Sequence, residues 1–502
     1  MSDTGPEFDE LMENGMRMAH AGDFAGAAGV FRDILAREPA HAGASEGLGL
    51  VALEQGEFEV AVGQLRRALE IGGVRPDLLY NLGNAEAASG RFAEAADAYR
   101  RATEMAPAFI EAWFNLAEVL EKLDRLDESI DAYRAVVALD ASIDSAHANL
   151  GCVLTEAGHL EEAIKSLGKA IELAPEFPPT HTNLGNALKY AGRFDESIAA
   201  HKEALRLAPD YADARYNLGA ALAMSGDHRA AAESLSAALA LKPDLSRAKF
   251  GLGASKIALD QAEEAVNLCE AAPPNDCEML ALRPFALAAA GRVDDAAIVA
   301  DYDRLIAATH VSAPDGYSTL ADFNAALVDH ILGHPSLAHA PTSHATVNGQ
   351  HTGNLLTEPK GPFADFEKIL WQAVQRFQAG QAKNVDHPFA ADRPLRELVV
   401  WSIVMESEGH QVAHIHPSGW VSGVYYPQVP IFKIDGHGPE AGWIEFGAPP
   451  PEIPYSGEVP LKTVQPEEGL LLLFPSFFYH RTIPYDSEAP RVSIAFDFRP
   501  AS

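Results

Sequence analysis

The C-terminal region is built around the segment Gly409-His-Gln-Val-Ala-His-Ile-His-Pro417, which is followed by Gly469-Leu-Leu-Leu-Leu-Phe-Pro-Ser-Phe-Phe-Tyr-His480 and by Arg491-Val-Ser493. Around these segments lie short runs of β-branched, aromatic and aliphatic residues, broken by Gly and Pro. The runs are Val399–Met405, Trp420–Tyr426, Leu470–Phe474 and Val492–Phe498. Such runs predict the strands of an antiparallel, mainly-β domain.

Histidines in these segments predict a metal site. On a strand, side chains at i and i+2 point to the same face, so His414 and His416 project together. His480 follows a strongly apolar strand, and a barrel would return it to the same mouth. An isolated His-x-His pair is more often surface or core. The third histidine and the downstream Arg-x-Ser favour a metal held by all three imidazoles.

Composition narrows the class of protein. A chain of 502 residues is expected to form two or more domains. Its net charge is −33, with 71 acidic and 38 basic residues. This field repels phosphate backbones and anionic lipid, so we expect neither nucleic-acid nor membrane binding. There is no run of about 18 apolar residues. Only three cysteines and an acidic, polar N-terminus predict a cytoplasmic protein without a disulfide framework or signal peptide.

The N-terminal half repeats itself every 34 residues. An Asn-Leu pair recurs in five of the units, usually followed by Gly, and a Pro closes most units. The recurring asparagines are Asn81, Asn115, Asn149, Asn183 and Asn217. The pattern resembles the tetratricopeptide repeat, in which each unit is a pair of antiparallel helices. Small residues let the two helices approach closely, and the resemblance implies a right-handed superhelix of stacked units.

The asparagine position has two interpretations. In the repeat family it lines the concave groove, and the row resembles the one in O-GlcNAc transferase, where amides hold an extended peptide. An amide donates and accepts at once, so it can grip a peptide main chain. Alternatively, the residues only bond neighbouring helices. The family resemblance in either case implies that the array binds a protein or peptide.

The domain limits follow from these patterns. Residues 1–10 are predicted to be a tail, 11–249 about seven repeats, and 250–308 a degenerate repeat with capping helices. Residues 309–318 are predicted to be a linker and 319–502 the β-domain. Within the latter, Thr319–Ile331 and Phe366–Phe377 have helical spacing, whereas Gly333–Gly361 is expected to form loop or irregular strand.

With these residues in place, the C-terminal domain resembles the Fe(II)- and 2-oxoglutarate-dependent oxygenases, and in particular their bacterial branch with the signature His-x-His-Pro…Ser-Gly-Val-Tyr-Tyr. Here it reads His414-Ile-His416-Pro417…Ser422-Gly423-Val424-Tyr425-Tyr426. The stretch from Val464 to His480 also matches. The resemblance implies a double-stranded β-helix, a jelly-roll barrel similar to that of cupins, with iron at its open end. The fold class is therefore an all-α repeat superhelix followed by a mainly-β barrel with flanking helices.

The resemblance also assigns a cosubstrate site. A guanidinium fork pairs with a carboxylate through two parallel hydrogen bonds, so Arg491 suits the distal carboxylate of 2-oxoglutarate. Ser493, two residues further on, can add a donor. Tyr425 or Tyr426 can supply another, and parity alone does not decide which faces inward.

One position departs from the superfamily, whose metal triad is His-x-Asp/Glu…His. Here His416 stands at the carboxylate position. It can ligate as a third imidazole, which its parity with His414 favours. Alternatively a later acid such as Asp435 or Glu445 completes the site, or water fills the place.

These inferences combine into one functional hypothesis. The chain is expected to be a dioxygenase that uses Fe(II), 2-oxoglutarate and O2 to hydroxylate a substrate, releasing succinate and CO2. Its repeats recruit a protein or peptide as substrate or partner. The first alternative is a metal-binding cupin-type enzyme without 2-oxoglutarate, which would leave Arg491-x-Ser493 unexplained. The second is a scaffold protein with an inactive barrel.

Overall fold

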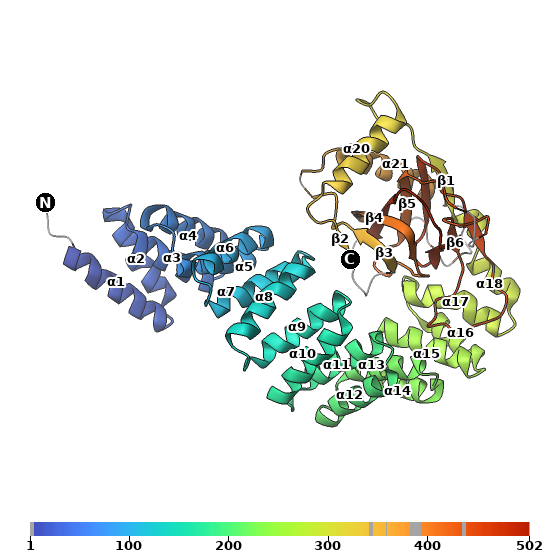
Figure 1. Ribbon diagram of the computed structural model, residues 1–502, viewed down its shortest axis with the longest axis horizontal. Helices are drawn as coiled ribbons and strands as arrows, with labels where there is room; N and C mark the ends of the chain where they lie inside the picture. The colour runs from blue at the N-terminus through green and yellow to red at the C-terminus, as the bar shows by residue number, and fades with distance from the viewer. Residues whose placement is uncertain are drawn as a thin grey trace. The chain divides into compact units, whose positions relative to one another are not determined.

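The computed structural model describes residues 5–340, 345–357, 359–381, 387, 389, 393–433 and 438–500 (Figure 1). The chain forms two compact units. The first contains residues 1–154 and 165–175, and the second contains residues 155–164 and 176–502.

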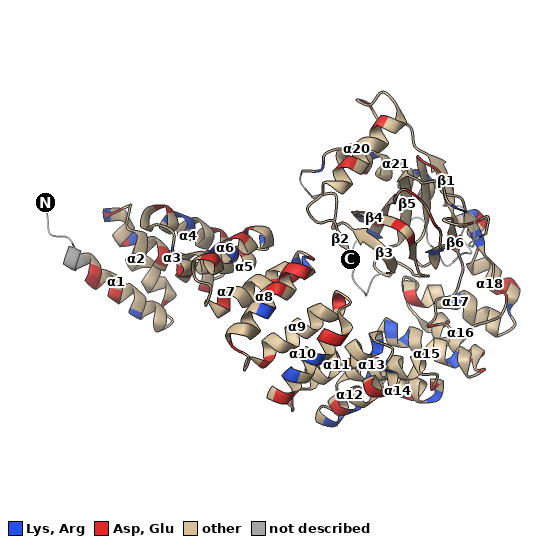
Figure 2. Cartoon of the chain, in the orientation of Figure 1, with Lys and Arg blue, Asp and Glu red and all other residues tan. Residues whose placement is uncertain are grey.

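The first unit is a series of antiparallel helix pairs. Its helices are α1 (Gly5–His20), α2 (Phe24–Arg37), α3 (Ala42–Glu54), α4 (Phe58–Gly72), α5 (Pro76–Ala88), α6 (Phe92–Met105), α7 (Ile110–Lys122) and α8 (Leu126–Leu139). The division between the units runs through α9 (Asp144–Glu156) and α10 (Leu160–Leu173). Acidic side chains are spread over many of these helices rather than gathered in one segment (Figure 2).

The second unit continues the pairs and adds the β-domain. Its repeat helices are α11 (Pro178–Tyr190), α12 (Phe194–Leu207), α13 (Ala212–Met224), α14 (His228–Leu241), α15 (Ser246–Ala258), α16 (Ala262–Ala271), α17 (Cys277–Ala289), α18 (Val293–Val299) and the short α19 (Tyr302–Leu305). The repeat pattern therefore predicted the helices correctly.

Glycine makes close packing within a pair possible. A Cβ added at Gly83 would lie 2.5 Å from the Tyr99 ring, and one at Gly219 would lie 2.6 Å from Leu235 Cγ. Real Cβ atoms do not approach heavy atoms this closely. Where a glycine follows Asn-Leu, as at Gly83 and Gly219, it thus accepts the large side chain of the second helix, as the small-residue pattern predicted.

The β-domain consists of two antiparallel sheets. The larger has seven strands in the order β1-β8-β5-β10-β4-β3-β2, and the smaller has three in the order β7-β6-β9. Their bounds are β1 (Ala307–His310), β2 (Ala338–His339), β3 (Thr346–His351), β4 (Leu395–Gln411), β5 (Val421–Gln428), β6 (Ile444–Phe446), β7 (Lys462–Val464), β8 (Leu470–Pro475), β9 (His480–Thr482) and β10 (Arg491–Pro500). This confirms the predicted fold class, helical repeats followed by an antiparallel sheet domain.

Two helices cover the outer face of the larger sheet, α20 (Leu320–Leu332) and α21 (Phe363–Gln381). Phe366 of α21 packs on Tyr425 of β5, with ring centroids 5.0 Å apart, and Trp371 packs on Phe498 of β10 at 4.9 Å. The sheet's other face lines a cavity. Strands β5 and β10 are consequently buried on both faces over most of their length.

Two predicted boundaries are wrong. Residues 5–10 of the predicted tail belong to α1, where Phe8 is buried against α2 and provides an apolar anchor. The predicted linker 309–318 begins inside β1, in which Thr309 pairs with Leu471 and His310 with Leu470. This pairing satisfies the hydrogen-bonding edge of β8. The segment Gly333–Gly361 contains β2 and β3.

The last repeat helices share a core with the β-domain within the second unit. The ring of Phe285 in α17 lies 5.9 Å from that of Tyr479, and Tyr302 lies 4.8 Å from Phe478. Residues 250–308 are expected to cap the repeat stack. In the structure, their helices α17 and α19 also pack against the β-domain. No helix in the described ranges is long and apolar enough to cross a membrane.

Candidate metal and cosubstrate site

Three histidines converge at one end of the cavity between the sheets. His414 and His416 follow β4, and His480 begins β9. His414 pairs with His480 as an isolated antiparallel bridge, with both N–O distances 3.1 Å. The amide of His416 donates to Ser476 O at 3.0 Å. A ligand nitrogen from each ring lies within 4.8 Å of the other two.

In each of the three rings Nδ1 makes the hydrogen bond, which leaves Nε2 available. His414 Nδ1 lies 2.8 Å from Val412 O, His480 Nδ1 lies 2.9 Å from Phe478 O, and His416 Nδ1 lies 2.6 Å from Asp497 Oδ1. Carbonyl and carboxylate oxygens only accept, so each Nδ1 carries the hydrogen. Each Nε2 therefore keeps its lone pair for a metal ion.

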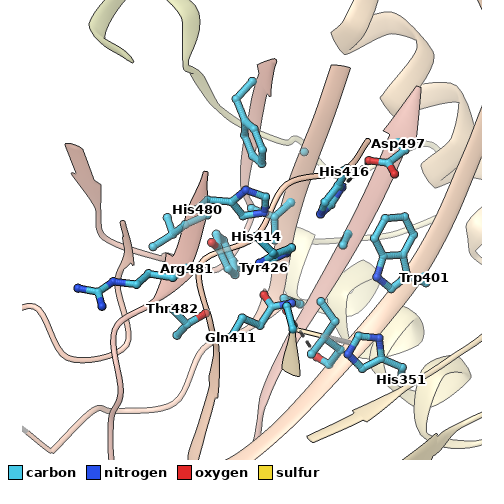
Figure 3. Close-up of a pocket in the computed structure, with 18 of the residues that line it drawn as sticks. His351, Trp401, Gln411, His414, His416, Tyr426, His480, Arg481, Thr482 and Asp497 are labelled. Carbon is cyan, nitrogen blue, oxygen red and sulfur yellow. Dashed lines mark hydrogen bonds and ion pairs between the residues drawn. The ribbon is translucent and has the colours of Figure 1, made fainter. Parts of the chain in front are cut away.

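Burial keeps the imidazoles of His414 and His480 uncharged. It lowers the pKa of His414 to about 3, with the neighbouring His416 as the next contribution. Burial, followed by the two other imidazoles, lowers the pKa of His480 well below its ordinary value. Neutral imidazole is the form that binds a metal ion. Figure 3 shows the three rings turned toward one another, with Asp497 beside His416.

The same cavity, of about 340 Å³, extends along β10 to Arg491. Side chains at alternate positions of this strand line the cavity, and they are Arg491, Ser493, Ala495, Asp497 and Arg499. Tyr426 is the inward-facing tyrosine of β5, with its ring centroid 5.1 Å from Arg491 Cζ. Tyr425 points the other way, and its hydroxyl donates to Asn324 Oδ1 of α20 at 2.5 Å.

Two buried polar atoms at this end lack a partner among the described residues. They are Arg491 Nε and the Tyr426 hydroxyl. Arg491 is 2% exposed, and Nη1 donates to Gly442 O at 2.7 Å. No carboxylate in the described ranges pairs with this guanidinium. A buried charge without a counter-ion costs several kcal/mol, roughly. The residues thus fit an anionic ligand such as the distal carboxylate of 2-oxoglutarate.

The alternative acid ligands do not join the histidines. Glu445 is buried, but Arg481 Nε donates to its Oε2 at 2.6 Å, and it is not part of the histidine cluster. Asp435 lies outside the described residues. The acid that does approach the cluster is Asp497. Its carboxylate accepts a hydrogen bond from Nδ1 of His416. No spacing pattern in the sequence links the two residues.

A histidine of the cavity was also expected elsewhere. His351 of β3, assigned to a loop, lines the wall together with Gln411 and Trp401. His351 sits where it does because β3 pairs with β4, placing it opposite Ile403. Only alternation within β3 could have indicated an inward-facing side chain, and Gly349 and Asn348 obscure that alternation.

The five asparagines of the repeats are used unequally. Asn115 Nδ2 donates to Asn84 Oδ1 at 3.0 Å and lies 3.3 Å from the Tyr80 hydroxyl. Asn149 Nδ2 donates to the Tyr133 hydroxyl at 3.2 Å. These two residues do bond neighbouring helices. The side-chain amides of Asn81, Asn183 and Asn217 are half-buried and make no hydrogen bond within the described chain.

Comparison with known families agrees with this architecture. Residues 399–497 match the family described as "Putative 2OG-Fe(II) oxygenase". Residues 19–76 and 80–146 match the family "Tetratricopeptide repeat", and 151–190 and 185–226 match "TPR repeat". The chain thus carries tetratricopeptide repeats followed by a domain of this oxygenase family, as the motifs predicted. No curated protein matches the sequence.

Several solved structures are similar to part of the chain. MamA from Desulfovibrio magneticus RS-1 is 24% identical, covering 33% of this chain and 92% of its own, with a TM-score of 0.31. YrrB, described as a TPR protein with an unusual peptide-binding site, is 22% identical over 37% of this chain and 95% of its own (TM-score 0.33). The C-terminal part of a TPR protein from Cytophaga hutchinsonii is 14% identical over 47% and 97% (TM-score 0.42).

Proposed function

We propose that the protein is an Fe(II)- and 2-oxoglutarate-dependent oxygenase that hydroxylates a substrate recruited by its repeats. The observation that carries the proposal is the content of one cavity. Three Nε2 lone pairs lie at one end, and a buried guanidinium with an unpartnered Nε lies at the other. A cupin-type enzyme without 2-oxoglutarate would need the histidines but would leave the cation unbalanced.

Each side chain has a definite part in this proposal. His414, His416 and His480 hold the metal through Nε2. Arg491 and the Tyr426 hydroxyl donate to the distal carboxylate of 2-oxoglutarate, and Ser493 adds a donor on the same strand. If Fe(II) and O2 bind here, one oxygen atom of O2 would pass to the succinate formed by oxidative decarboxylation of 2-oxoglutarate, and the other would enter a substrate C–H bond.

Enclosure of the site by the two sheets serves this chemistry. The cavity walls from β5 and β8 are buried, which keeps bulk water from the cosubstrate. Trp401, Gln411 and His351 form the remaining wall, where a substrate side chain would enter. The cation at the opposite end fixes the orientation of 2-oxoglutarate, because a fork-shaped donor pairs with a carboxylate in one plane.

The repeats deliver the substrate or a partner that carries it. Amides left unpaired at Asn81, Asn183 and Asn217 can donate to and accept from a peptide main chain. Tethering such a peptide to the oxygenase raises its effective concentration at the cavity. A protein or peptide substrate is therefore favoured over a free metabolite.

The first test is anaerobic addition of Fe(II) and 2-oxoglutarate to the full-length protein. We expect the weak visible charge-transfer band that forms when 2-oxoglutarate chelates iron. Arg491→Ala should lose the band while retaining iron, and His480→Ala should lose both. Iron binding without any band in the wild-type protein favours the cupin-type alternative.

The second test identifies the substrate. Full-length His480→Ala serves as bait, because it keeps the repeats and cannot turn over what it captures. Captured proteins are then incubated with the wild-type enzyme, and mass spectrometry looks for one added oxygen with stoichiometric succinate. A scaffold with an inactive barrel predicts capture without oxygen incorporation.

A further inference from the structure

His416 is held differently from the other two histidines. Backbone carbonyls accept from Nδ1 of His414 and His480, whereas a carboxylate, Asp497, accepts from Nδ1 of His416 at 2.6 Å. Asp497 is 4% exposed, and the His416 side chain is 10% exposed. The contact is therefore a buried, charge-assisted hydrogen bond, which is stronger than the two to carbonyls.

The sheet positions Asp497 through a short chain of hydroxyls. Asp497 pairs with Ser422 across β10 and β5, and Ser422 Oγ donates to Asp497 Oδ1 at 2.6 Å. Ser476 Oγ lies 2.8 Å from Ser422 Oγ. Because a hydroxyl carries one hydrogen, Ser422 donates to the carboxylate and accepts from Ser476. Asp497 Oδ1 thus accepts from both His416 Nδ1 and Ser422 Oγ.

The backbone at Gly419 packs closely against this hydrogen-bond network. A Cβ added at Gly419 would lie 2.6 Å from Ser476 Oγ and 3.2 Å from Asp497 Cγ. Gly419 itself is tied to the repeats, since Cys277 Sγ of α17 lies 3.3 Å from its carbonyl oxygen. The loop that carries His416 is therefore fixed between the larger sheet and α17.

This arrangement bears on the histidine at position 416, where the superfamily has Asp or Glu. An Asp or Glu at this position would bring a negative charge to the metal directly, whereas a third imidazole brings none. A carboxylate that accepts from the far nitrogen makes a ligating imidazole a better electron donor and fixes its orientation. In this chain the carboxylate bonds to Nδ1 of His416 and stands on a different strand, β10.

We propose that Asp497 is a positioning residue that acts through His416 and supplies the negative charge missing from the metal's ligands. This inference rests on the proposed function, because it presupposes that the three histidines hold a metal. It predicts that the effect of Asp497 depends on which residue occupies position 416.

The experiment measures metal affinity of the full-length apoprotein, with Co(II) and Ni(II) as probes and calorimetry as readout. Asp497→Asn should weaken binding roughly 10- to 100-fold. Ser422→Ala should weaken it less, because the carboxylate remains. Glu445→Gln is the matched control, since it alters another buried carboxylate of the cavity region that bonds to Arg481 and to no histidine. It should leave affinity unchanged.

A charge exchange separates positioning from a structural role. His416→Asp places two carboxylates side by side, so Asp497→Asn should strengthen metal binding in that background although it weakens binding in the wild type. If Asp497 has only a structural role, Asp497→Asn should weaken metal binding in both backgrounds, and that result would overturn the inference. The comparison between backgrounds remains informative even if the single variants unfold partly. Absence of metal binding by the wild type would overturn the proposed function instead. Equal affinity of wild type and Asp497→Asn would overturn only this inference.

Discussion

Arg491 and Asp497 lie toward opposite ends of the cavity along β10 and are bonded differently. At one end Arg491 has an unpartnered Nε beside the unpartnered Tyr426 hydroxyl. At the other end Asp497 accepts from both His416 and Ser422. Unmet hydrogen-bonding capacity in a cavity indicates a place kept for a ligand, whereas a fully bonded charge indicates a support for its neighbours. The predictions below test this contrast.

The largest effect is expected at the unbonded end. Arg491→Ala removes the cation that we assign to the 2-oxoglutarate carboxylate, and should raise its Kd by at least about 100-fold. Titration monitored by the charge-transfer band measures it. Arg481→Ala, which removes a guanidinium already bonded to Glu445, is the control and should change the Kd little. Equal effects of the two variants would contradict the assignment.

The removal of a buried polar group that lines no cavity should instead increase the stability of the fold. His201 in α12 is 0% exposed, and neither ring nitrogen has a partner among the described residues. Its ring packs on Gly185, at the position where other repeats carry Leu65, Leu167 or Leu235. His201→Leu should therefore raise the free energy of unfolding by about 1–2 kcal/mol at neutral pH. Denaturant unfolding measures this difference.

The same histidine makes the stability depend on pH. Burial, followed by the charge of Lys189, lowers the pKa of His201 to about 4, below its ordinary value of 6.5. The unfolded chain then binds more protons between these values, so stability falls as pH drops from 6.5 to 4, by up to about 3 kcal/mol. His201→Leu should flatten that part of the profile. A profile unchanged by the substitution would contradict the explanation.

Two adjacent tyrosines offer a smaller, matched test. Tyr426→Phe removes an unpartnered hydroxyl in the cavity and should raise the Kd for 2-oxoglutarate by about tenfold, with little change in stability. Tyr425→Phe removes the hydroxyl bonded to Asn324 and should cost about 1 kcal/mol of stability, with the Kd unchanged. Exchanged phenotypes would mean that the wrong tyrosine faces the ligand.

The smallest effect is expected in the repeats. Asn115→Ala removes bonds to Asn84 and Tyr80 and should lower stability by about 0.5–1.5 kcal/mol. Asn217→Ala, at the equivalent position in a later repeat, should leave the melting temperature nearly unchanged but weaken capture of the partner. Thermal unfolding and the bait experiment distinguish the two. Loss of capture only with Asn115→Ala would contradict a groove formed by the unpaired amides.

Sequence patterns predicted what is periodic or local. The 34-residue period located the helix pairs, and apolar runs located β4, β5, β8 and β10. His414, His416, His480 and Arg491 could be selected because each stands at a fixed distance from a strong strand pattern. The structure brings all four to one cavity.

What escaped prediction depends on pairing between distant strands. Asp497 reaches His416 only because β10 lies between β4 and β5, and no spacing in the sequence reveals that order. The inward tyrosine could not be chosen because both faces of β5 are buried, so its residues do not alternate between polar and apolar. The start of the β-domain was missed because β1 is short and polar.

Strand β1 has a practical consequence for anyone who wants to produce the barrel by itself. A fragment starting at residue 319 would lack the chain that covers the β8 edge, leaving four consecutive leucines, 470–473, with an open row of amides and carbonyls. It would also strip Tyr302 and Phe285 from the rings they cover. Such a fragment should self-associate through that edge, so the smallest tractable fragment that contains the β-domain must begin upstream, among the last repeat helices.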